Sequence, residues 1–295
     1  MNVHLFGLLP LLALLYAATF WGLIWYPVRW LAEAGVAGLW QTLISYACAL
    51  LVMTLARGFA SRDVPSGGWS VVWLVFAAGW TNVAFLLAVI DDQVVRVLIL
   101  FYLSPLWAVL LARWLLGERI RTVTWFMLLL GLAGAVVMLY RPDIFSDPTT
   151  RGDWLALSAG LAFALTNVMI RRLGMLSDTL KTQLSWIGVV LVSLVLLALT
   201  GEPLPEAGWR GWVGAMALGV PGFLLSTFAV VYAVSRMPVQ RSSVIMLFEI
   251  VVGALSAWWL AGETLGWQEG LGGLMIIGAG LVAISLDEKK VVEHE

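Results

Sequence analysis

Ten long apolar stretches constrain this chain more than any other feature of its sequence. Cutting the sequence at charges, prolines and glycine clusters places these stretches at 6–28, 36–56, 70–90, 94–116, 122–140, 154–172, 181–200, 211–234, 241–261 and 266–286. A helix of about 20 residues crosses the hydrocarbon core of a bilayer. The apolar runs are continuous and do not alternate, so helices are expected rather than barrel strands. The sequence predicts an all-α integral membrane protein with ten transmembrane helices.

Composition excludes several other classes of protein. Charged residues make up 12% of the chain, about half the fraction of a soluble domain. The net charge of −1 and the lack of a basic patch argue against nucleic-acid binding. The single cysteine, Cys48, and two histidines near the ends, His4 and His294, offer neither metal ligands nor a nucleophile–base pair inside the membrane. We therefore expect no enzyme, metal or cofactor, and expect a small-molecule substrate and the lipid bilayer as partners, with the oligomeric state left open.

Lysine and arginine predict the orientation of the spans, because cytoplasmic loops carry an excess of both. Ten spans place the two termini on the same side. Twelve cations fall on that side: Arg57, Arg62, Arg113, Arg119, Arg121, Arg171, Arg172, Lys181, Arg236, Arg241, Lys289 and Lys290. Four fall on the other: Arg29, Arg141, Arg151 and Arg210. Both termini are therefore expected to be cytoplasmic, with Asp91–Asp92 and the loop Asp143–Asp153 outside.

The two halves of the chain are similar at an offset of 145 residues. Leu116-Gly117-Glu118 aligns with Ala261-Gly262-Glu263, and Arg96 aligns with Arg241. Each half holds five spans, and because five is odd the second half must enter the membrane from the opposite side. This arrangement is an inverted-topology repeat, which in secondary transporters forms a substrate site near the midplane, between the halves.

The residues around these repeated turns resemble a known group. They are Phe101 to Trp107 followed by Leu115 to Arg119, and Phe248-Glu249 followed by Leu260 to Glu263. On these residues, and over essentially its whole length, the chain resembles the drug/metabolite transporter superfamily, specifically its EamA-type ten-helix exporters.

The resemblance implies two EamA-like five-helix repeats, at 1–145 and 150–288, and a polar C-terminal tail at 289–295. It also implies export of small metabolites, such as amino acids, or of drugs, often against protons. One departure is that Glu249-Ile250 stands where the group often has Glu-Pro. We therefore expect the fourth span to be kinked at Pro105 and the ninth span to be unbroken.

Glu249 is the most informative single position. Eight residues at about 1.5 Å each place it about 12 Å deeper than Arg241, close to the middle of the bilayer. A carboxylate there costs several kcal/mol unless it is paired, hydrated or protonated. We predict that Glu249 binds substrate and couples transport to proton movement. The alternative is a permanently protonated side chain that only bonds a neighbouring helix.

Arg96 and Arg241 lie one turn inside their helices. Each can extend its charge to the nearer interface. Alternatively, one of them faces the cavity and pairs with a substrate carboxylate, which the donor fork of arginine suits well.

Five further side chains are candidates for lining a substrate site. Asn82 and Asn167 are amides inside apolar spans, where they must be hydrogen-bonded, either to another helix or to substrate. Trp21, Trp80 and Tyr102 fall near the centres of their spans. These aromatic rings either pack in the core or line a pocket for an apolar or aromatic solute.

Proline and glycine predict breaks in two spans. Pro105 removes one backbone hydrogen bond in the fourth span, and Pro221-Gly222 do the same in the eighth. Such breaks are candidate hinges for alternating access. The tracts Gly131–Gly134 and Gly270–Gly280 permit close helix packing.

The sequence leaves four functions to compare. The first is a secondary exporter of small amphipathic metabolites in a bacterial-type inner membrane. The second is a nucleotide-sugar or phosphate-ester exchanger of the same superfamily, which needs cavity-facing cations. The third is an intramembrane enzyme, for which the residues are missing, and the fourth is a membrane scaffold without transport.

Overall fold

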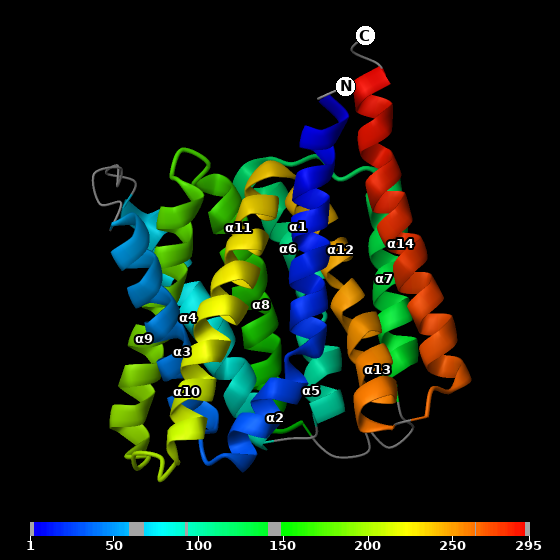
Figure 1. Cartoon of the computed structure of the whole chain (residues 1–295). Helices are drawn as coiled ribbons and strands as arrows, with labels where there is room; N and C mark the ends of the chain where they lie inside the picture. Colours follow the sequence, from blue (N-terminus) through cyan, green and yellow to red (C-terminus); the bar gives the residue numbers. More distant parts are fainter. Residues whose placement is uncertain (1–2, 59–67, 92–93, 141–148, 263, 293–295) are drawn as a thin grey trace.

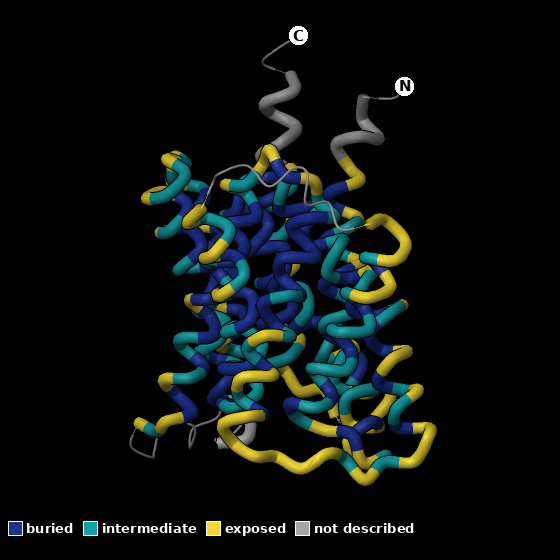
Figure 2. Tube along the Cα trace, turned by 90° about the vertical axis from the view of Figure 1, so that its left-hand side faces the viewer, coloured by how far each residue is buried: buried dark blue, intermediate teal, exposed yellow. Residues whose placement is uncertain are grey.

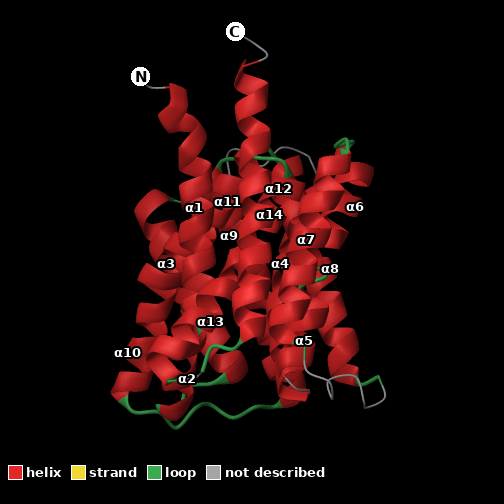
Figure 3. Cartoon of the chain, turned by 90° about the vertical axis from the view of Figure 1, so that its right-hand side faces the viewer, coloured by secondary structure: helices red, strands yellow, loops and turns green. Residues whose placement is uncertain are grey.

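The computed structural model describes residues 3–58, 68–91, 94–140, 149–262 and 264–292, and these are helices joined by short turns and loops (Figure 1). The helices are α1 (Val3–Leu23), α2 (Trp25–Glu33), α3 (Gly38–Arg57), α4 (Gly68–Asp91), α5 (Val94–Phe101), α6 (Ser104–Leu116), α7 (Thr122–Leu139), α8 (Arg151–Arg172), α9 (Asp178–Thr200), α10 (Trp209–Ala217), the π-helix η2 (Leu218–Leu224), α11 (Leu225–Arg236), α12 (Val239–Met246), α13 (Phe248–Ala261) and α14 (Trp267–Val292). No strand occurs among these described residues (Figure 3).

Ten helical spans in the described residues are long and apolar enough to cross a membrane. They are Leu8–Glu33, Gly38–Arg57, Gly68–Val89, Arg96–Leu116, Thr122–Leu139, Arg151–Arg172, Asp178–Thr200, Trp209–Arg236, Val239–Ala261 and Trp267–Ile284. The predicted fold class, an all-α membrane protein with ten transmembrane helices, is confirmed. Asp92, the loop residues 143–148, Glu263 and the tail residues 293–295 lie outside the described part of the chain.

The packing of the helices follows an inverted repeat. The first residues of α1 and the last residues of α14 lie at the same end of the bundle (Figure 1). The third span, α4, packs on the sixth, α8, and the corresponding eighth span packs through α11 on the first, α1. In the same way the fourth span contacts the sixth while the ninth contacts the first. Exchanging the halves therefore reproduces the contacts, as the sequence offset predicts.

The fourth and ninth spans are both interrupted, and at equivalent points. In the fourth span α5 ends at Phe101 and α6 begins at Ser104; in the ninth, α12 ends at Met246 and α13 begins at Phe248. The expectation of an unbroken ninth span is therefore wrong. Without a proline, the chain turns at Leu247, whose carbonyl accepts the amide of Ile250 at 3.0 Å in a tighter, 3₁₀-type bond.

Pro105 and its surroundings explain the break in the fourth span. A residue with an N–H at this position would donate to the carbonyl of Phe101, so proline leaves that carbonyl without its usual helical partner. The Phe101 carbonyl instead lies against Gly160 of α8, where an added Cβ would stand 2.7 Å from the oxygen. A glycine of the second half thus packs directly on the broken span of the first.

Two further irregularities affect the first and eighth spans. The first bends at Ile24, between α1 and α2, where Pro27 cannot donate to the carbonyl of Leu23. This bend was not predicted, and the span runs to Glu33 rather than ending near residue 28. In the eighth span, Pro221 lies inside η2, so the predicted break occurs as a local π-helix.

All ten spans contribute buried residues, and the buried residues do not mark a single amphipathic face. Buried residues concentrate along the centre of the bundle, and exposed residues lie toward its outside and its ends (Figure 2). Many of the exposed residues are large and apolar. Between α7 and α14, a Cβ added at Gly134 would lie 2.7 Å from the carbonyl oxygen of Gly272. The predicted role of the glycine tracts in close helix packing is therefore confirmed for this pair.

Candidate functional site

Tyr102 and Glu249 meet where the two broken spans cross. Tyr102 lies in the turn between α5 and α6, and Glu249 lies in the first turn of α13. The ring of Tyr102 packs on the cluster that contains Leu247 and Ile250, and its hydroxyl lies close enough to the Glu249 side chain to interact with it. Glu249 is near the middle of the span Val239–Ala261, so the contact lies at mid-depth. One partner comes from each half of the inverted repeat.

Gly22 brings the first span against Glu249. A Cβ added at Gly22 would stand 2.6 Å from the carbonyl oxygen of Glu249, so α1 and α13 approach backbone to backbone at this level. Trp21, the preceding residue, therefore lies at nearly the same depth as Glu249. The half-buried ring of Trp21 stacks on Phe223 of η2, with centroids 5.5 Å apart and planes 24° from parallel.

An aromatic cluster continues from Trp21 across the interior. Phe223 stacks on Tyr46 of α3, and the hydroxyl of Tyr46 donates to Oδ1 of Asn82 on α4 at 2.9 Å. Phe20 meets Phe223 edge-on, at 5.9 Å. The structure thus connects the predicted residues Trp21 and Asn82 through two rings. These rings are Phe223 and Tyr46, which sequence reasoning missed. Both missed rings are near the centres of their spans, the same criterion that selected Trp21.

Trp80 and Asn167 lie outside this chain of contacts. The indole N–H of Trp80 donates to Ser158 on α8 at 3.1 Å, and its ring stacks on Phe76. Asn167 is buried in α8, and its Oδ1 has no hydrogen-bond partner among the described residues. Trp80 therefore bonds helix to helix, while Asn167 keeps a buried acceptor that a polar ligand could satisfy.

The two arginines are buried at opposite ends of the bundle. Arg96, in the first turn of α5, forms a two-bond ion pair with Asp153 of α8. Its side chain is buried, and its guanidinium is held by this carboxylate. Arg241 is buried in α12, at the end of the molecule that holds the termini. The structure thus places neither arginine beside Glu249, which lies at mid-depth.

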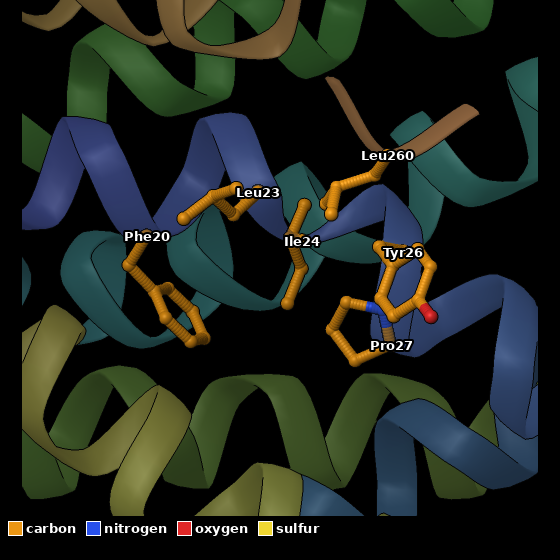
Figure 4. A pocket seen from close by; sticks show the side chains of 6 residues that line it. All are labelled: Phe20, Leu23, Ile24, Tyr26, Pro27 and Leu260. Atoms are coloured by element: carbon orange, nitrogen blue, oxygen red, sulfur yellow. The ribbon is translucent and has the colours of Figure 1, made fainter. Parts of the chain in front are cut away.

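A shallow apolar hollow of about 240 Å³ opens at the elbow between α1 and α2 (Figure 4). It is lined by Phe20, Leu23, Ile24, Tyr26, Pro27 and Leu260. None of the predicted site residues lines it, but Phe20 also contacts the aromatic cluster. The hollow therefore borders the interior cluster at Phe20 and Ile24.

The chemistry of the mid-depth site follows from its groups. A carboxylate beside a phenol and close to an indole can hold a proton or an amine. The aromatic rings add to the attraction for an amine, because aromatic faces attract cations. Among the described residues, no three His, Cys, Asp or Glu side chains are placed to hold a metal ion.

Comparison with known proteins agrees with this architecture. The profile of the EamA-like transporter family matches residues 8–140 and 150–286, one match in each half. An uncharacterized transporter of Archaeoglobus fulgidus is 26% identical over 226 residues, which cover 76% of this chain and 80% of that protein. A protein of known crystal structure is 21% identical and superposes with a TM-score of 0.76, covering 93% of this chain and 97% of its own, so it shares the fold. The chain belongs to the EamA-like transporter family.

Proposed function

We propose that this transporter exports small amphipathic metabolites, amino acids or related compounds, by alternating access coupled to protons. The observation that carries the proposal is the contact of Tyr102 with Glu249 at mid-depth, between the two halves. A site between inverted repeats can open to either side as the halves rock around it. The cation count supports a multi-pass protein of a bacterial-type inner membrane with both termini in the cytoplasm.

Glu249 is the proposed coupling group. When ionised, its carboxylate accepts hydrogen bonds from the Tyr102 hydroxyl or from a substrate amine. When protonated, it loses its attraction for an amine, so proton and substrate compete for one group. If the site opens to the two sides of the membrane in turn, this competition couples the entry of a proton to the exit of a substrate.

The surroundings of Glu249 favour an amine with an apolar or aromatic substituent. Trp21 lies at the level of Glu249, and its ring leads to Phe223 and Tyr46. Phosphate esters are a poorer fit, because Arg96 is buried against Asp153 rather than in the interior site. The nucleotide-sugar or phosphate-ester exchanger is therefore the less favoured alternative.

The test measures flux of radiolabelled leucine and phenylalanine in proteoliposomes, with and without an imposed pH gradient. Glu249→Gln keeps the shape of the side chain but cannot ionise, and it should abolish the gradient-driven component. Tyr102→Phe removes the hydroxyl alone and should reduce that component less. Glu206→Gln, at an exposed loop carboxylate, is the matched control and should transport like the unaltered protein.

Two results would contradict the proposal. If Glu249→Gln responds to the pH gradient as the unaltered protein does, Glu249 is not the coupling group. If neither amino acid nor a panel of small amines moves in the unaltered protein, the proposed substrate class is wrong. Correct folding of each variant is checked by size-exclusion chromatography in detergent.

A further inference from the structure

The short helix α5 connects the mid-depth site to a buried ion pair. Arg96 lies in its first turn, and Tyr102 directly follows its last residue, Phe101. Tyr102 is six positions after Arg96, which is about 9 Å along a helix. One end of α5 therefore contacts Glu249 through Tyr102, and the other end is held by Asp153 of α8.

The ion pair between Arg96 and Asp153 is short and buried, and it has further hydrogen bonds around it. Nε of Arg96 lies 2.6 Å from Oδ1 of Asp153, and the residues are 5% and 3% exposed. Asp153 is itself held in place, because its Oδ2 accepts the amide of Thr150 at 2.9 Å while its own amide donates to the Thr150 hydroxyl. Breaking a buried pair by removing one partner is strongly destabilising for the state that contains it. The pair therefore stabilises the packing of α5 on α8.

Two features allow α5 to move as a unit. The regular α-helical bonding ends directly after it, because the amide of Leu103 bonds three residues back, to Leu100, and Pro105 has no N–H to donate to Phe101. Its contact with α8 beyond the ion pair includes Val97, which is fully buried in a small cluster with Ala156 of α8 and Ala88 of α4. The larger contact of α5 is at its inner end, where the ring of Phe101 lies against Phe85 of α4 and Phe163 of α8. Near Arg96 the side chains are small, and they resist separation less than a large interdigitated interface does.

The opposite end of the bundle is held by different residues. There Arg236 of α11 pairs with Asp178 of α9 at 2.6 Å, and Lys181 contacts the same carboxylate at 3.1 Å. In the first and sixth spans, Ala18 to Gly22 align with Ala162 to Thr166 at an offset of 144. The same offset places Asp153 on Leu9 of α1. The second half therefore cannot repeat the Arg96–Asp153 pair with Arg241 at this position.

We propose that α5 is a gate at the end of the molecule opposite the termini, and that Arg96–Asp153 is the latch that keeps it closed. The proposal rests on the proposed export by alternating access. When Tyr102 loses its contact with Glu249, α5 stays packed on α8 at Phe101 but loses its link to the ninth span. It then rotates about the Tyr102-Leu103 turn. Arg96 and Asp153 separate, and water takes the place of the partner at each side chain. The occupancy of the central site thereby controls the opening at one end.

Thiol labelling tests the gate without any substrate. In a Cys48→Ser background, Val97→Cys places the only thiol in the interface between α5 and α8. A charged, membrane-impermeant thiol reagent is added to the purified protein in detergent, and the labelling rate is followed by mass spectrometry. Adding Arg96→Gln should raise that rate at least about tenfold, because the closed state loses its buried ion pair. Arg236→Gln is the matched control at the other end and should leave the rate unchanged.

Two more variants make the result decisive. Arg96→Lys keeps the charge but loses the two-bond geometry, so it should give an intermediate rate and is the fallback if Arg96→Gln does not fold. The exchange Arg96→Asp with Asp153→Arg should return the rate towards that of Val97→Cys alone. An unchanged rate in folded Arg96→Gln or Arg96→Lys would overturn the gate, as would an equal rise in Arg236→Gln. Because the readout needs no transport, failure of proton coupling at Glu249 would be seen separately.

Discussion

Tyr46 of α3 lies flat on Phe223 of η2, with ring centroids 4.5 Å apart and planes 10° from parallel. One ring comes from each half, and the hydroxyl of Tyr46 continues the contact to Asn82 of α4. The stack therefore joins the π-helix of the eighth span to the first half at mid-depth. Single-turn π-helices recur at functional sites in other helical proteins.

Removing the Tyr46 hydroxyl should lower stability slightly and leave the stack in place. We expect Tyr46→Phe to lose about 0.6 to 1 kcal/mol, the usual size of one such bond inside a membrane protein. Phe223→Ala removes the shared ring and should lose about 3 kcal/mol. Thermal unfolding in detergent measures both, with Tyr16→Phe at an exposed tyrosine as the control. Equal stability of Phe223→Ala and Tyr16→Phe would contradict a structural role for the stack.

Glycines at the helix contacts should differ sharply from glycines in open positions. A Cβ at Gly188 of α9 would overlap the carbonyl oxygen of Val75 of α4, whereas nothing lies within 4 Å of a Cβ at Gly280 of α14. Gly188→Ala should therefore separate α9 from α4 and lower the melting temperature. Gly280→Ala should be neutral or stabilising by up to about 1 kcal/mol, because alanine favours the helix. The same melting temperature for both variants would show that the close approach is unimportant.

Pro105→Ala should change the rate of the transport cycle more than the fold. The new N–H can bond the carbonyl of Phe101 and make α5 continuous with α6. We expect a folded, inserted protein whose turnover falls several-fold because the hinge is stiffer, with Pro203→Ala in an exposed loop as the control. Turnover in proteoliposomes is the measurement. A turnover equal to that of Pro203→Ala would limit Pro105 to a packing role.

The predicted orientation can be tested with reporter fusions. Twelve cations against four predict that a reporter fused after Lys290 gives a cytoplasmic signal, since cationic loops stay in the cytoplasm. A reporter inserted within Asp143–Asp153 should give an external signal. The reverse pattern at both positions would invert the orientation and place the α5 gate on the cytoplasmic side.

The sequence by itself determined the features that the bilayer dictates. A backbone in hydrocarbon must satisfy its own hydrogen bonds, so ten apolar runs of the right length had to be ten helices. Five spans in each half then required the inverted repeat. The turns at Gly117 and Gly262, both with φ of +69°, and the break before Pro105 also follow from local chemistry, because glycine adopts positive φ readily and proline lacks an N–H.

Only the tertiary structure decided which side chains meet. Nothing local distinguishes an apolar residue facing lipid from one facing another helix, so the sequence could not show that Tyr102 reaches Glu249 or that Tyr46 stacks on Phe223. Nor could it pair Arg96 with Asp153, because partner choice depends on how α5 packs against α8. The break at Leu247 has the same origin. No proline imposes it, and it accompanies the close contact of Gly22 with the start of α13.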